Sequence, residues 1–110
     1  MYKSFDPSSN DVAIEFDLKV TASSNNEQFG TLRNSSATSR GILELNRFGG
    51  SLNTWHHLKI IVSTTNARIY LDNSANPVYT YTASDITRLY IDFDTDVTEL
   101  DYKNFVIYPI

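Results

Sequence analysis

The feature that most constrains the fold of this chain is an alternating pattern in two neighbouring segments, 57–62 and 68–72. In each segment every second residue is apolar and is expected to face inward, and the residues between them are expected to face outward. A period of two places alternate side chains on opposite faces of an extended strand. The polar stretch 63–66 joins the two segments and has the composition of a tight turn, so together they predict a β-hairpin. The apolar residues expected on its buried face are Leu58, Ile60, Val62, Ile69 and Leu71.

The same alternation runs from Val12 to Val20, and no segment shows a convincing helical period. Further short strands are expected at residues 29–32, 42–45, 77–82, 88–94 and 99–110. Polar turn segments separate them at the spacing typical of a sandwich. We therefore predict an all-β, antiparallel two-sheet β-sandwich formed by one domain, residues 1–110, as a module of a longer protein. The predicted core is Ile14, Phe16, Leu18, Leu58, Ile60, Val62, Ile69, Leu71, Leu89, Ile91, Phe93, Phe105 and Ile107.

Composition narrows the classes of partner. The chain has 110 residues and no cysteine, which excludes disulfides and thiolate-bound metals. Its formal net charge of −4 gives no general attraction to nucleic acid or to an anionic membrane surface. No apolar run approaches the roughly 20 residues that a membrane-spanning helix needs. We expect no nucleic-acid partner and no membrane insertion.

Residues 55–73 resemble a hairpin of laminin-G and concanavalin A-like jelly-roll modules, Trp-His-x-hydrophobic followed by Arg-x-Tyr-hydrophobic-Asp-Gly. Asn73 stands where that family usually has Gly. Residues 89–91 and 99–108 resemble the family's closing strands. The resemblance implies a concanavalin A-like jelly roll in which the last strand lies beside Val12–Val20. It also implies a glycan- or protein-binding module, since few members catalyse anything.

The chain looks most similar to the trimmed jelly rolls of phage tail and microbial surface proteins. That resemblance implies an extracellular or virion-surface location, a cell-surface polysaccharide as partner and a homo-oligomer formed through the parent protein. We predict a non-catalytic carbohydrate-binding or adhesion module. The alternative is a structural assembly or protein-interaction module that binds no sugar.

Two similar rows of polar residues are candidates for the binding site. Arg68, Tyr70 and Asp72 share the outward face of one segment, and the pattern recurs twenty residues later. The second row is Arg88, Tyr90 and Asp92. A tyrosine ring offers an apolar platform to a sugar, while Arg donates and Asp accepts hydrogen bonds. The simpler explanation is that both rows are ordinary solvent-facing strand residues.

An acidic run near the C-terminus is a candidate calcium site. Its members are Asp92, Asp94, Asp96 and Glu99. Calcium takes six to eight oxygen ligands, which clustered carboxylates provide. An EF-hand is excluded because Val97 occupies the position that requires glycine. The run is otherwise explained as an acidic strand end that protects a sheet edge.

The residues needed for catalysis are incomplete. The segments 15–17 and 99–101, each Glu-x-Asp, resemble the start of the catalytic strand of jelly-roll glucanases but lack its second Glu. His56 and His57 are adjacent on a strand, so they point to opposite faces and cannot hold one metal together. We expect His56 near the core edge, His57 outside, and Trp55 as a structural anchor rather than a sugar platform.

Overall fold

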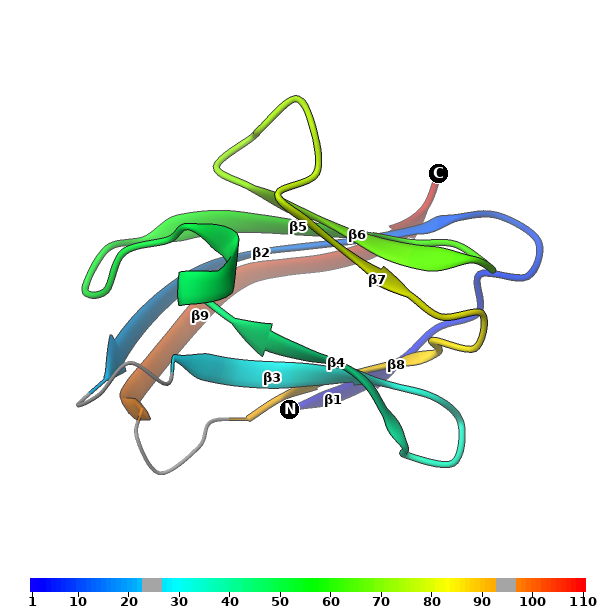
Figure 1. Ribbon diagram of the computed structural model, residues 1–110, viewed down its shortest axis with the longest axis horizontal. Coiled ribbons are helices and arrows are strands. Elements are labelled where there is room, and N and C mark those ends of the chain that lie inside the picture. Colours follow the sequence, from blue (N-terminus) through cyan, green and yellow to red (C-terminus); the bar gives the residue numbers. More distant parts are fainter. Residues whose placement is uncertain (23–26, 93–96) are drawn as a thin grey trace.

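Two antiparallel sheets pack face to face in the computed structural model, which describes residues 1–22, 27–92 and 97–110 (Figure 1). The four-stranded sheet has the order β1 (Tyr2–Ser4), β8 (Arg88–Ile91), β3 (Gln28–Arg33), β4 (Ser39–Glu44). The five-stranded sheet has the order β7 (Tyr79–Thr82), β6 (Asn66–Leu71), β5 (His56–Val62), β2 (Val12–Ala22), β9 (Val97–Pro109). A short 3₁₀ helix, η1 (Asn46–Phe48), follows β4. No helix within the described ranges is long and apolar enough to cross a membrane.

The predicted sandwich and hairpin are confirmed. The hairpin is the β5–β6 pair, with Leu58 opposite Leu71 and Ile60 opposite Ile69. The strand predicted from Val12 is β2, which pairs with β5 on one side and with the terminal strand β9 on the other. The last strand therefore lies beside β2, as the jelly-roll resemblance implied.

Strand ends differ from the prediction at several places. β1 was not predicted, because its three residues are exposed and show no apolar alternation. β7 begins at Tyr79 rather than at residue 77, and β8 ends at Ile91 rather than at residue 94. Phe93 and Asp94 lie outside the described residues.

The core lies between the two sheets, and its predicted residues follow the alternation. Those found buried are Ile14, Phe16, Leu18, Leu58, Ile60, Val62, Ile69, Leu71, Leu89 and Ile91. Phe105 and Ile107, also predicted to be buried, are only partly buried and pack against the core from the edge strand. The short strands and loops add further fully buried residues that the alternation did not single out, Phe29, Leu32, Leu43, Leu45 and Ile86.

A β-bulge in β9 aligns the edge strand with the core. The register shifts opposite the Glu15–Asp17 segment, and Asn104 has a positive φ of 58°. An inserted residue reverses the alternation beyond it. Phe105 consequently faces inward and stacks on Phe16, with 5.4 Å between the ring centroids. The Asn104 side chain reaches the outer face, where it contacts Asp17.

Candidate functional site

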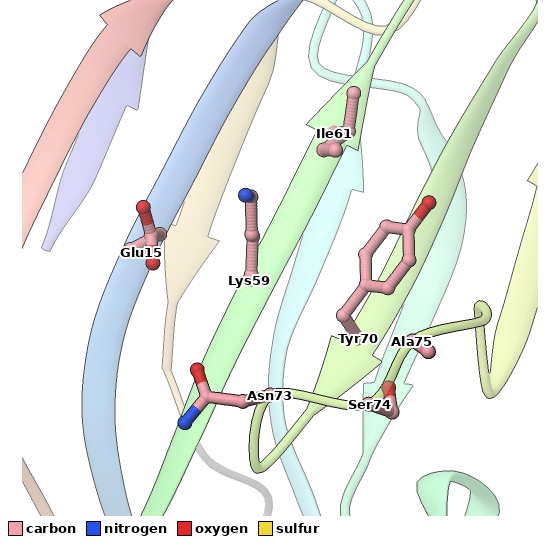
Figure 2. Close-up of a pocket in the computed structure, with 7 residues that line it drawn as sticks. All are labelled: Glu15, Lys59, Ile61, Tyr70, Asn73, Ser74 and Ala75. Carbon is pink, nitrogen blue, oxygen red and sulfur yellow. The ribbon is translucent and has the colours of Figure 1, made fainter.

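A hollow lies on the outer face of the five-stranded sheet, the face turned away from the core. The loop between β6 and β7 rises from this sheet on the side away from the four-stranded sheet (Figure 1). Its residues Asn73, Ser74 and Ala75 form one wall of the hollow. The cavity measures about 340 Å³, within the size range of small-ligand sites. Its lining residues are Glu15, Lys59, Ile61, Tyr70, Asn73, Ser74 and Ala75, shown in Figure 2.

Strand pairing brings three chemically different side chains together in the hollow. Glu15 of β2 lies opposite Lys59 of β5, and Lys59 lies opposite Tyr70 of β6. Directly opposed residues share a face, so a carboxylate, an ammonium group and a phenol ring form one row. Figure 2 shows Lys59 between the other two, with Asn73 and Ser74 on the loop that follows β6. The row offers an aromatic surface together with hydrogen-bond donors and acceptors.

A histidine bridges two carboxylates beside the hollow. His57 Nε2 lies 2.7 Å from Glu15 Oε1, and His57 Nδ1 lies 2.9 Å from Asp17 Oδ1. The Tyr108 hydroxyl donates to the other oxygen of Glu15. Asn104 Nδ2 donates to the other oxygen of Asp17 at 2.7 Å. All four carboxylate oxygens therefore have partners within the protein.

These contacts shift the pKa values of the cluster in opposite directions. Hydrogen bonds to Asp17 and then to Glu15 raise the pKa of His57. The Tyr108 hydroxyl and then His57 lower the pKa of Glu15, and His57 followed by Asn104 lowers the pKa of Asp17. The arrangement therefore favours an imidazolium held between two carboxylates.

The cluster predicts a pH dependence of stability. Because the folded pKa of His57 is raised, its contribution is complete below its unfolded value of about 6.5 and is lost as the pH rises through the folded value. The lowered pKa values of Glu15 and Asp17 give a contribution that is present above about pH 4 and is lost in more acidic solution. Urea unfolding should therefore give a lower stability at pH 9 than at pH 6. In the His57→Gln variant this decline should be smaller, and an equal decline in both proteins would contradict the assignment.

His56 fastens a loop to the sheet. As predicted, it lies at the core edge, and it is only 7% exposed. Its Nδ1 lies 2.8 Å from Asp72 Oδ2, and its Nε2 lies 2.9 Å from the carbonyl oxygen of Ser51. The Ser51 hydroxyl is 3.5 Å from the same nitrogen, which the main chain already occupies. The contacts of His56 with Asp72 and Ser51 therefore hold the loop before β5 against the sheet.

The first predicted row, Arg68, Tyr70 and Asp72, divides between the hollow and the framework. Tyr70 lines the hollow. Asp72 accepts a hydrogen bond from the main-chain nitrogen of His57 at 3.0 Å in addition to its contact with His56. Arg68 lies 3.7 Å from the carboxylate of Asp11. Asp72 and Arg68 thus have partners within the protein, and the ring of Tyr70 faces the hollow.

The second predicted row, Arg88, Tyr90 and Asp92, belongs to the other sheet. The Arg33 guanidinium lies 4.3 Å from the centre of the Tyr90 ring. The centres of the Tyr2 and Tyr90 rings are 4.8 Å apart. Arg88 lies over Tyr2, and Asp92 is 4.0 Å from Arg33. The two rows therefore occupy opposite outer faces of the sandwich and cannot form one site.

The predicted calcium site is only partly covered by the described residues. Asp94 and Asp96 of the proposed calcium site lie outside the described residues. Within residues 1–22, 27–92 and 97–110, no group of three or more acidic or histidine side chains is placed to hold a metal ion.

The expectation for Trp55 was wrong, because the residue is 41% exposed and does not anchor the core. Its ring lies 4.2 Å from Lys103 Nζ and 5.4 Å from Lys19 Nζ.

The fold is shared with several solved structures. The two sheets and their strand order are those of a jelly-roll β-sandwich, and solved structures of a galectin and of an alginate lyase share this architecture over most of the chain. No protein-family model matches the chain, and no curated protein matches its sequence. The sheet topology and the solved structures confirm the concanavalin A-like jelly roll as the fold.

Three solved structures illustrate the similarity. Sheep galectin-11, in complex with glycerol, has a TM-score of 0.54 at 10% identity, covering 94% of this chain and 95% of its own. The alginate lyase AlyA1 of polysaccharide lyase family 7 from Zobellia galactanivorans has a TM-score of 0.60 at 13% identity, covering 98% and 65%. The receptor-binding domain of a mosaic C/D botulinum neurotoxin has a TM-score of 0.58 at 12% identity, covering 90% and 33%. Identities this low establish a shared fold and nothing finer.

Proposed function

We propose that this chain is a non-catalytic carbohydrate-binding module and that the glycan lies in the hollow against Tyr70. The observation that carries the proposal is the position of the Tyr70 ring in a walled hollow beside Lys59 and the side chains of Asn73 and Ser74. A sugar ring presents C–H groups to an aromatic face and hydroxyls to polar groups around it. The hollow supplies both kinds of partner.

Two further observations bear on the proposed binding role. A galectin and a toxin receptor-binding domain share the fold, although alginate lyases share it too. Glu15 and Asp17, the paired carboxylates nearest the hollow, are both engaged by His57 and by a second hydrogen-bond donor. Carboxylates held in this way are poorly placed to act as an acid and a base on a substrate.

The proposed setting is an adhesion or receptor-binding part of a phage tail or microbial surface protein, outside the cell or on the virion. A parent protein that displays several copies would compensate for weak binding at each site, since linked sites raise avidity without new contacts. Cell-surface polysaccharide, which repeats the same sugar many times, suits such a partner.

A second candidate function is assembly through the edge strand β9. This strand closes one side of the five-stranded sheet and leaves its outer backbone groups unpaired within the described residues. Four large apolar side chains on it or next to it are exposed: Tyr102, Val106, Tyr108 and Ile110. Exposed apolar edge strands are sites of strand-to-strand association. This observation favours a structural module if no sugar binds.

The proposal predicts that Tyr70→Ala weakens glycan binding by about tenfold or more, because the variant loses the ring platform. The parent domain is first screened on a glycan array, and the affinity of each variant for a selected glycan is then measured by calorimetry. Tyr90→Ala is the matched control, since it removes the same ring from the opposite face of the sandwich. Retention of binding in Tyr70→Ala with loss in Tyr90→Ala would place the site on the other sheet. Absence of any binding by the parent would favour the assembly module.

A further inference from the structure

The ammonium group in the hollow forms no direct ion pair in the part of the chain that the structure describes, although its charge interacts with that of Glu15 at longer range. Lys59 stands directly opposite Glu15 across the β2–β5 pair, where opposite charges ordinarily interact. Both oxygens of Glu15 instead bond other groups, His57 Nε2 at 2.7 Å and the hydroxyl of Tyr108. No carboxylate of residues 1–22, 27–92 or 97–110 lies within 4.0 Å of the Lys59 nitrogen.

Neutral hydrogen-bonding groups surround this cation. Asn73 and Ser74 on the β6–β7 loop and Tyr70 on β6 line the same hollow (Figure 2). The Ser74 hydroxyl oxygen accepts a bond from the main-chain nitrogen of Leu71 at 3.3 Å, which leaves its hydrogen available to a ligand. An amide, a hydroxyl and a phenol close to an ammonium group without a direct ion pair form a set of donors suited to an anionic oxygen.

The one carboxylate that lines the hollow is compensated. Glu15 bonds His57, whose pKa its two carboxylate neighbours raise, so the imidazolium offsets negative charge at this point. The other carboxylate of the cluster, Asp17, does not line the hollow. Among the charged lining residues, Glu15 is held by two hydrogen bonds, whereas Lys59 makes no hydrogen bond or direct ion pair within the described residues and is partly buried.

We propose that the hollow selects an acidic glycan and that Lys59 binds its anionic substituent, the carboxylate of a uronate or a sulfate ester. This inference rests on the proposed glycan-binding function and names the class of glycan. The sugar ring lies against Tyr70 while its negative group contacts the ammonium, and no direct ion pair of Lys59 has to break for this contact to form. A neutral sugar of the same shape leaves the ammonium without this contact.

The test compares matched ligands. A glucuronate-containing oligosaccharide is measured against its carboxyl-reduced form, and a sulfated oligosaccharide against its desulfated form, by calorimetry at low and moderate salt. The parent should bind the charged member of at least one pair about tenfold more tightly, as expected for one charge-assisted hydrogen bond. The pair that shows the preference identifies the substituent.

Three variants locate the effect. Lys59→Gln should abolish the preference for the charged member of the pair, and Lys59→Arg should retain it. Lys3→Gln, which removes the same charge from β1 of the other sheet, should behave as the parent. A preference that persists in Lys59→Gln, or equal affinity for both members of each pair, overturns the inference while leaving glycan binding intact. Failure of every glycan to bind overturns both the inference and the proposed function.

Discussion

Phe16→Ala is expected to lower the free energy of unfolding by about 3–5 kcal/mol, the cost of removing a large side chain from a packed core. Phe16 is 0% exposed and lies on the central part of β2, between β5 and β9. Its ring stacks on Phe105, which the bulge in β9 turns toward the core. The substitution therefore removes the packing partner that holds the edge strand as well as the buried ring itself.

Urea unfolding followed by tryptophan fluorescence measures this effect. Val106→Ala is the control on the neighbouring strand, because its side chain is 49% exposed. A surface truncation of this kind should change stability by no more than about 0.5 kcal/mol. Equal losses in the two variants would show that Phe16 does not lie in the core as described.

Gly30→Ala is expected to destabilise the protein by about 3 kcal/mol or more, at the upper end of overpacking effects. A Cβ atom on Gly30 would lie 2.3 Å from the main-chain oxygen of Tyr90 in the neighbouring strand β8. The clash is with backbone, so no rotamer change relieves it, and β3 and β8 must move apart.

Gly49→Ala separates this clash from the general cost of losing a glycine. Gly49 has a φ of 80° and no atom within 4 Å of an added Cβ. Its substitution costs only the backbone strain, about 1–2 kcal/mol. Thermal unfolding of both variants should rank Gly30→Ala below Gly49→Ala, and the reverse order would contradict the close approach of the two strands.

The central strands of the five-stranded sheet were predictable because alternation alone defines them. β2, β5 and β6 each bury every second residue, so periodicity identified both the strands and their inward faces. β1 escaped prediction because its exposed residues are held only by pairing with β8. The partly buried state of Phe105 likewise depends on a bulge whose only local sign is Asn104, a residue that tolerates positive φ.

The site was only partly predictable. Alternation placed Tyr70 on an outward face, and it placed Glu15, Asp17, His57 and Lys59 there too, but one strand does not specify its neighbour. The pairing of β2 with β5 is what brings His57 between the two carboxylates and sets Lys59 opposite Glu15, whose oxygens bond other groups. The two Arg-Tyr-Asp rows look equivalent along the chain, yet they belong to different sheets. The loop that walls the hollow has no alternation to predict its course.

The most direct test of the account is a map of main-chain amide shifts when a glycan selected on the array is titrated into the isotope-labelled domain. Binding in the hollow predicts the largest changes at Lys59, Tyr70 and the loop residues Asn73 to Ala75, with β1 and β4 unaffected. Changes confined to the face that carries Tyr90, or to the β9 edge, would contradict the proposed site.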